Sequence, residues 1–398
     1  MDARTHHLTR LLLASRALRA FADGFVAVVL PAYLLALGHG LLEVGLLGTA
    51  ALLGSALATL AVGRWGHRLS LRGMLLGAAL LMALTGVGFA TLSSFWPLLL
   101  VAFMGPLNPS SGDASVFLPL EHTALASAAA AESRTTAFAR YSFFGSMFGA
   151  AGALAAAVPD WLTRAAGIEA VDALRAMFVF YAAIGLLVWA LYQRLPKTRK
   201  EEHAPAAPLG PSRTIVWKLA GLFSVDSFAG GLILNSLLAL WLFKSFGMSL
   251  AAAGAFFFWT GMLSAASQLA APAIARRIGL INTMVFTHVP SSLFLIGAAC
   301  TSNLELALAL LLARSALSQM DVPARSAFVM SVVTPPERPA AASFTAVPRS
   351  LAAAISPSIT GAMFAVGMMA APLIACGVMK ITYDLALYVA FRHVRPRQ

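Results

Sequence analysis

Long apolar runs separated by short polar segments form the dominant pattern of this 398-residue chain. Twelve of the runs approach or exceed the roughly 20 residues that a helix needs to cross a bilayer. They are 14–38, 41–63, 73–92, 96–120, 135–158, 176–194, 215–243, 250–275, 283–302, 304–333, 340–367 and 371–391. Two of the dividing turns, near 38–40 and 367–372, hold no charge and are marked only by glycine or proline. The pattern predicts twelve transmembrane helices.

The composition excludes a soluble protein of this size. Hydrophobic residues make up 59% of the chain and charged residues only 11%, whereas about a quarter of the residues of a soluble domain are charged. So few charges cannot cover the surface of a soluble fold. The net charge of +12 comes from Lys and Arg scattered among short loops, which indicates cytoplasmic loops and not a patch that binds nucleic acid.

Basic residues are concentrated in every second loop. These loops hold Arg64, Arg68, Arg72, Arg134, Arg194, Lys197, Arg199, Lys200, Arg213, Arg276, Arg277, Arg338, Arg392, Arg395 and Arg397. The loops between them hold only Arg164, Arg175 and Lys244. Because loops rich in Lys and Arg stay on the cytoplasmic side, we expect both termini to be cytoplasmic. No small-residue cleavage site follows the first run, which predicts a retained anchor and not a signal peptide.

A polar stretch near the middle of the chain divides it into two halves. We predict an N-terminal six-helix bundle at 1–194, a cytoplasmic linker at 195–214 and a C-terminal six-helix bundle at 215–398. An internal repeat supports the division. A shift of 209 residues aligns Arg68 with Arg277 and Arg140 with Arg349, and a shift of 203 aligns the aspartates of the first run in each half.

The loop after the second run resembles a known family signature. It reads GRWGHRLSLR over 63–72, and it is similar to the G-x-L-A-D-R-x-G-R-K signature of the major facilitator superfamily of secondary transporters. The matching residues are Gly63, Arg68 and Arg72, and the differing residues are His67, Ser70 and Leu71. The resemblance implies an all-α integral membrane fold of two pseudo-symmetric six-helix bundles that transports a solute by alternating access.

Glycines recur at helical spacing in the fifth run, at 145, 149 and 152. They are weakly similar to the G-P-x-x-G-G run of many exporters, but the proline is missing. Small residues at this spacing let two helices approach closely in lipid, so we predict a tight helix contact here.

Four aspartates lie inside the runs that the resemblance places around the central cavity: Asp23, Asp113, Asp226 and Asp321. Charge is costly at this depth, so each needs a partner or a function. Two interpretations stay open. Proton coupling is assigned to Asp321 or Asp113, because burial and a nearby Arg can move the proton affinity of a carboxylate in opposite directions. A gating latch of ion pairs is assigned to Asp23, Asp226, Arg19, Arg140, Arg325, Arg349, Arg68 and Arg72.

The tenth run carries a polar stripe. Arg314, Ser318, Asp321 and Arg325 follow one another at i, i+4, i+7 and i+11, which places them on one helix face, and a proline at 323 is expected to bend the helix. Arg314 is the candidate anchor for a carboxylate or phosphate of the solute, and an internal ion pair is the alternative. The other candidate substrate-binding residues are Ser318, Tyr33, Asn108 and Asn235, for which hydrogen bonds between helices are the alternative.

Motifs for other functions are missing from the sequence. It has no phosphate-binding GxxxxGK[ST] loop, no GxSxG elbow, no HExxH and no set of catalytic residues, so we expect no enzyme, no metal and no cofactor. We predict a secondary active transporter that exports a small organic solute and is coupled to protons. Uptake or exchange of an organic anion is the alternative, and a membrane enzyme, an assembly factor, a channel or a receptor are more remote.

The expected partners are the solute, protons and the lipid bilayer, with no nucleic acid. We also predict a monomer in the cytoplasmic membrane of a bacterium, because the Ala- and Arg-rich, Lys-poor composition is typical of GC-rich bacterial genomes.

Overall fold

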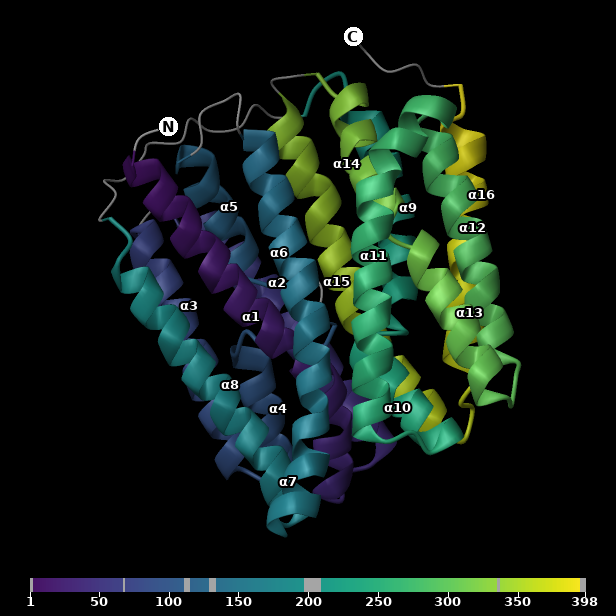
Figure 1. Cartoon of the computed structure of the whole chain (residues 1–398). Coiled ribbons are helices and arrows are strands. Elements are labelled where there is room, and N and C mark those ends of the chain that lie inside the picture. Colours follow the sequence, from purple (N-terminus) through teal and green to yellow (C-terminus); the bar gives the residue numbers. More distant parts are fainter. Residues whose placement is uncertain are drawn as a thin grey trace. The chain divides into compact units, whose positions relative to one another are not determined.

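The computed structural model describes residues 3–66, 69–110, 115–128, 134–196, 209–334 and 337–393, and every regular element in these ranges is a helix (Figure 1). The α-helices are α1 Ala3–Ala36, α2 Leu41–Trp65, α3 Leu71–Thr91, α4 Phe95–Met104, α5 Phe117–Ala128, α6 Arg134–Leu154, α7 Val158–Ala166, α8 Ala170–Gln193, α9 Arg213–Gly231, α10 Asn235–Phe246, α11 Leu250–Ile278, α12 Leu280–Ala299, α13 Leu304–Leu317, α14 Asp321–Val332, α15 Arg338–Ala365 and α16 Ala371–Phe391. Helices satisfy their own backbone hydrogen bonds, which lipid cannot do for them.

Nine helical segments of the described residues are long and apolar enough to cross a membrane. They are Leu8–Ala36, Leu41–Trp65, Leu71–Thr91, Ala137–Ala166, Ala170–Gln193, Arg213–Phe246, Leu250–Ile278, Leu280–Ala299 and Ala371–Phe391. The chain is therefore a multi-pass membrane protein. The runs predicted at 96–120, 304–333 and 340–367 are largely helical too but are not among the nine, so the count of twelve stays a prediction.

Three of the predicted runs are interrupted in the structure. The fourth is divided between α4 and α5, the seventh between α9 and α10, and the tenth between α13 and α14. In the tenth run the cause is Pro323, which has no N–H to continue the helix but fits the first turn of a new one. The expected bend is a complete break, with Asp321 as the first residue of α14.

The chain divides into two compact units. The first unit comprises Met1–Glu202 with Leu234–Phe258, and the second comprises His203–Ile233 with Trp259–Gln398. These units differ from the predicted halves because α10 and the start of α11 group with the first unit. Compactness alone does not define a domain, and the boundaries at 194 and 214 stay a prediction.

Within the first unit, α1 packs along α6 and α3 packs along α8 (Figure 1). A Cβ atom added to Gly152 of α6 would overlap the carbonyl oxygen of Phe21, and one added to Gly24 of α1 would overlap that of Gly149. The two backbones are therefore in direct contact, which confirms the tight helix contact predicted from the glycine spacing.

The second unit repeats this packing scheme with its own helices. Here α9 packs along α15 and α12 packs along α16. A core of buried apolar residues joins α9, α12, α14 and α16, and it includes Phe223, Met284, Phe328 and Leu387. In both units the first and fifth predicted spans of a half pair together, as do the third and sixth, which supports the internal repeat.

Candidate functional site

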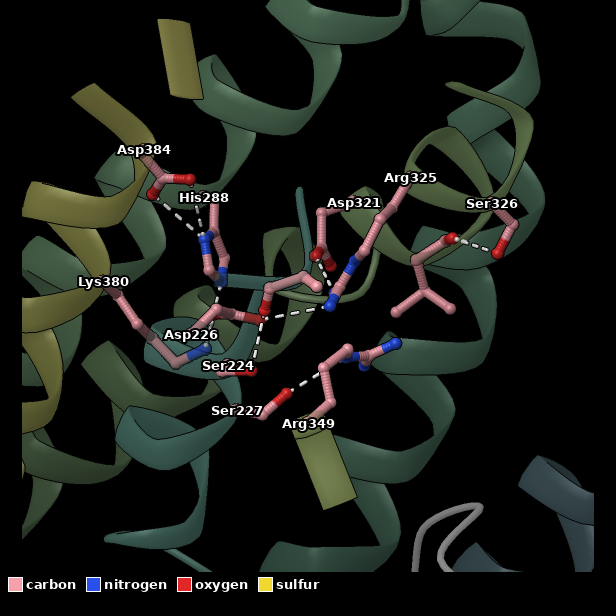
Figure 2. Close-up of polar contacts among 12 residues, drawn as sticks. Ser224, Asp226, Ser227, His288, Asp321, Arg325, Ser326, Arg349, Lys380 and Asp384 are labelled. Carbon is pink, nitrogen blue, oxygen red and sulfur yellow. Dashed lines mark hydrogen bonds and ion pairs between the residues drawn. The ribbon is translucent and has the colours of Figure 1, made fainter. Parts of the chain in front are cut away.

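Six ionisable side chains meet inside the second unit (Figure 2). They are Asp226 of α9, His288 of α12, Asp321 and Arg325 of α14, and Lys380 and Asp384 of α16, and we call them the Asp226 network. Lys380 is the most exposed of the six side chains, at 12%. Burying a charge is costly unless it is paired and hydrogen-bonded, so their pairing decides whether the second unit is stable.

Asp226 lies at the centre of the network and carries two cations. Its Oδ1 accepts a hydrogen bond from Lys380 Nζ at 2.6 Å, and its Oδ2 accepts one from Arg325 Nη1 at 3.2 Å. The other terminal nitrogen of Arg325 donates to Asp321, four residues earlier on α14. Residues at this spacing share a helix face, as the sequence predicted for this pair. The Arg325 guanidinium also lies over the ring of Phe223, 5.4 Å from its centroid.

His288 connects the two charged residues of α16. Its Nδ1 lies 3.0 and 3.1 Å from the two carboxylate oxygens of Asp384, and its Nε2 lies 3.4 Å from Lys380 Nζ. A carboxylate accepts and an ammonium donates, so Nδ1 carries the proton and Nε2 presents its lone pair. The partners thus assign a neutral imidazole.

Two further arginines of the second unit lie outside these ion pairs. Arg349 of α15 donates from Nε to the Ser227 hydroxyl at 3.1 Å, and it has no carboxylate partner among the described residues. The side chain of Arg314, in the last turn of α13, makes neither a hydrogen bond nor an ion pair with the described part of the chain. The carbonyl end of α13 offers it partial negative charge only. Both side chains are partly buried, where a guanidinium favours an anionic partner.

The first unit holds a closed ionic cluster around Glu121 of α5. Arg19 and Tyr141 donate to Oε2 of this fully buried carboxylate, while Tyr192 donates to Oε1 at 2.6 Å and Ser15 donates to Oε1 at 2.7 Å. Four donors leave little room for a further ligand. We therefore interpret the cluster as structural.

Asp23 does not receive the ion pair expected from its position. Arg19 lies one turn earlier on α1 but pairs with Glu121, and no ion pair within 4.0 Å joins Asp23 to any described residue. The reason is geometric: α5 presents a carboxylate to Arg19 in place of its own helix neighbour. Asp23 is buried, and its assignment to a latch stays a prediction.

The remaining predicted solute contacts lie in the first unit. The Tyr33 ring is fully buried, and its hydroxyl donates to the Phe89 carbonyl at 2.6 Å. The side-chain oxygen of Asn108 accepts from the Ser110 backbone N–H at 3.1 Å, and Asn235 begins α10. The Tyr33 hydroxyl thus bonds to a neighbouring helix, whereas the Asn108 bond is local, and the assignment of both residues to the solute stays a prediction. Ser318 directly follows α13 in the second unit, one turn beyond Arg314.

The other predicted latch residues have varied surroundings. Arg72 of α3 donates to the backbone carbonyl of Gln193 at 2.6 Å, at the end of α8, where a helix favours a cation. Arg140 is exposed on α6 and forms no ion pair within the described ranges. Asp113 and Arg68 lie outside the described residues.

Three charged residues and one histidine of these clusters were not predicted from the sequence: Glu121, Lys380, Asp384 and His288. A signal was present, because Lys380 and Asp384 lie four residues apart in an otherwise apolar run, as Asp321 and Arg325 do. No group of three or more His, Cys, Asp or Glu that could hold a metal ion occurs among the described residues.

Comparison with known proteins gives consistent results over nearly the whole chain. A family model described as Major Facilitator Superfamily matches residues 12–318. The uncharacterized membrane protein YJR124C of Saccharomyces cerevisiae is 25% identical over an alignment 422 positions long, which covers 96% of this chain and 93% of the yeast protein. Among solved structures, a bacterial homologue of the human lysosomal transporter Spinster in an inward-facing, unoccupied conformation has a TM-score of 0.77 at 15% identity, covering 98% of both chains. The nucleoside transporter NupG has a TM-score of 0.72 at 14% identity, covering 98% of this chain and all of that one. These likenesses confirm the fold class expected from the sequence.

Proposed function

Because the chain belongs to the Major Facilitator Superfamily, and is therefore a membrane transporter and not an enzyme, we propose that it is a proton-coupled carrier of a small organic anion. The observation that carries the proposal is Arg314 of α13, a partly buried guanidinium whose side chain has no hydrogen-bond or ion-pair partner among the described residues.

The charge balance of the second unit supports an anionic solute. Among the buried and half-buried side chains of its helices are four permanent cations, Arg314, Arg325, Arg349 and Lys380, against three carboxylates, Asp226, Asp321 and Asp384. With His288 neutral, the set has one cation in excess. A solute carboxylate or phosphate supplies the missing charge, and the planar fork of an arginine suits either group.

The proposed coupling to protons depends on Arg325, which two carboxylates share. Arg325 pairs with both Asp226 and Asp321, so a proton on either carboxylate releases the guanidinium to the other. This arrangement supports Asp321 as a coupling residue, and Asp113 remains the second candidate from the sequence.

Thermal shift with matched ligands tests the class of solute. We expect benzoate or glucose 6-phosphate to raise the unfolding temperature of the purified protein, and benzamide, glucose and benzylamine to leave it unchanged. Arg314→Ala removes a charge-assisted hydrogen bond and should weaken anion binding by about tenfold or more. Arg314→Lys keeps the charge but loses the fork, and should give an intermediate loss. Arg213→Ala, at an exposed arginine that begins α9, is the control. Stabilisation by benzylamine alone would contradict the proposal and indicate that the solute is a cation.

The direction of transport needs a separate experiment. Export is the direction that the sequence favours, and uptake or exchange is its alternative. In proteoliposomes of known orientation, the sign of the pH gradient that accelerates solute entry separates symport from antiport. The bacterial cytoplasmic membrane, the cytoplasmic termini and the monomeric state are part of this proposal.

A further inference from the structure

His288 faces a cation and an anion with its two ring nitrogens. On one side it donates from Nδ1 to Asp384, and on the other its Nε2 lies 3.4 Å from the ammonium of Lys380. The same ammonium is bound to Asp226 at 2.6 Å (Figure 2). The Lys380 ammonium thus interacts with both the Asp226 carboxylate of α9 and the lone pair of the His288 imidazole.

This arrangement excludes a proton from Nε2 while Lys380 stays in place. A protonated imidazole would direct an N–H at an ammonium, and two like charges at this separation repel strongly. When Lys380 leaves, the lone pair becomes free, and Asp226 loses one of its two cations. An imidazolium at His288 restores the lost charge beside Asp226, while its Nδ1–H stays on Asp384.

We propose that Lys380 and a proton on His288 alternate as the cation beside Asp226, with Lys380 moving to the anionic solute when His288 is protonated. In its last step the inference rests on the proposed function, because it needs an anion to attract Lys380. Before the exchange, Asp226 is negative, Lys380 positive and His288 neutral. Afterwards one proton has come from water to Nε2, and Lys380 keeps its own proton and pairs with the solute.

The exchange adds one proton and one anion to the protein. For a monovalent solute the added charges cancel, so the exchange leaves the net charge of the buried set unchanged, and no further buried charge has to be paid for in the membrane. The solute and the proton therefore bind together and leave together.

The other charged groups around His288 do not replace Lys380 in this role. The elements packed against α12 are α13, α14 and α16. From α16, Tyr383 meets the imidazole edge to face, with the ring centroids 6.3 Å apart. Arg325 of α14 is already divided between Asp226 and Asp321, and Arg314 of α13 makes no described contact with the ring. Lys380 is the described cation at hydrogen-bond distance of Nε2.

The first test uses no solute, so its outcome is independent of the proposed function. The full-length protein is labelled with ¹⁵N-histidine, and the His288 signal is assigned by its loss in His288→Gln. We expect the resting wild type to show a neutral ring with the proton on Nδ1 at neutral pH. In Lys380→Gln, His288 should take up its proton at a pH higher by about one unit or more. Lys380→Arg keeps the positive charge and should leave the titration near that of the wild type.

Lys244→Gln is the matched control, because Lys244 is an exposed lysine in the last turn of α10 and lies outside the network. A charged ring, or a proton on Nε2, in the wild type at neutral pH would overturn the inference without any need for the lysine variants to fold. An unchanged titration in Lys380→Gln would overturn it as well.

The second test joins the inference to transport. When the anion found by thermal shift is added in unbuffered solution, the wild-type protein should take up about one proton per bound anion. His288→Gln should lose this uptake and should bind the anion more weakly, because no proton then replaces Lys380 beside Asp226. Binding without proton uptake in the wild type rejects the exchange and leaves the anion carrier intact. If no anion binds while the titration behaves as expected, the proposed function fails and the Lys380–His288 coupling stands.

Discussion

Within the Asp226 network, the aspartate itself compensates the charge of two buried cations. Asp226 holds Lys380 on one oxygen and Arg325 on the other, and all three side chains are almost completely buried. Removing one partner of a buried ion pair leaves the other charge without compensation. Loss of the aspartate therefore leaves two buried cations without the carboxylate that they share.

Asp226→Asn should destabilise the protein by about 3–5 kcal/mol, because it leaves two buried cations facing a neutral amide. The comparison is Asp172→Asn, which breaks the exposed ion pair to Arg175 and should cost about 0–1 kcal/mol. Thermal and denaturant unfolding in detergent measure both variants side by side. Equal losses would show that burial does not govern the energy of these pairs.

Some of this detail follows from the sequence and some does not. The Asp321–Arg325 pair was predictable, because four residues along one helix fix the direction of both side chains. The Arg19–Glu121 pair was not, since the competing Asp23 has ideal spacing and only the rotation and depth of α5 favour Glu121. Likewise, the residue that reaches Asp226 from α16 depends on how α9 and α16 cross, which one sequence does not give.

At the scale of the elements, hydrophobicity locates the helices, but small residues and helix breaks determine how the helices pack. Within the ranges that the structure describes, nine of the twelve predicted spans correspond to helices long and apolar enough to cross a membrane, whereas the bend expected between α13 and α14 is a full break. Pairs of helices are held together where glycine removes the side chain between them, as between α1 and α6.

Gly152→Ala should weaken the α1–α6 contact, because the new methyl group overlaps the Phe21 carbonyl and forces the backbones apart. Gly77→Ala on α3 is the control: an added Cβ there meets no atom within 4 Å. Relieving the backbone freedom of a helical glycine should stabilise the control by about 0.5–1 kcal/mol. We expect Gly152→Ala to lower the unfolding temperature relative to wild type and Gly77→Ala to raise it. A rise in Gly152→Ala would contradict the close backbone contact.

Glu337, directly before α15, accepts hydrogen bonds from the residues that precede α9. Hydrogen bonds from Ser212, Thr334 and the Gly210 backbone lower the pKa of Glu337 to about 2. A lowered pKa stabilises the folded state fully above the ordinary value near 4.5, and the contribution is lost as pH falls toward 2. Glu337→Gln should therefore lower the unfolding temperature at pH 7, and its difference from wild type should shrink below pH 4.5. A difference independent of pH would mean that shape and not charge is responsible.

At the scale of the whole molecule, the distribution of basic loops predicts how the chain lies in the membrane. Cysteines introduced at Ala206 and Ala165 should react from opposite sides of intact cells, with Ala206 inside. The native Cys300, which is exposed, must be replaced first, and the buried Cys376 is replaced for safety. Labelling of both sites from outside would reverse the predicted topology.

The break between α13 and α14 has a mechanical consequence. A continuous helix behaves as a stiff rod, because its ladder of hydrogen bonds passes bending from one end to the other. Three residues, 318–320, interrupt that ladder, so α13 and α14 behave as two rods joined by a short hinge. Tilting of α13 then reaches Arg314 without rotating α14, which keeps Asp321 and Arg325 in register with Asp226.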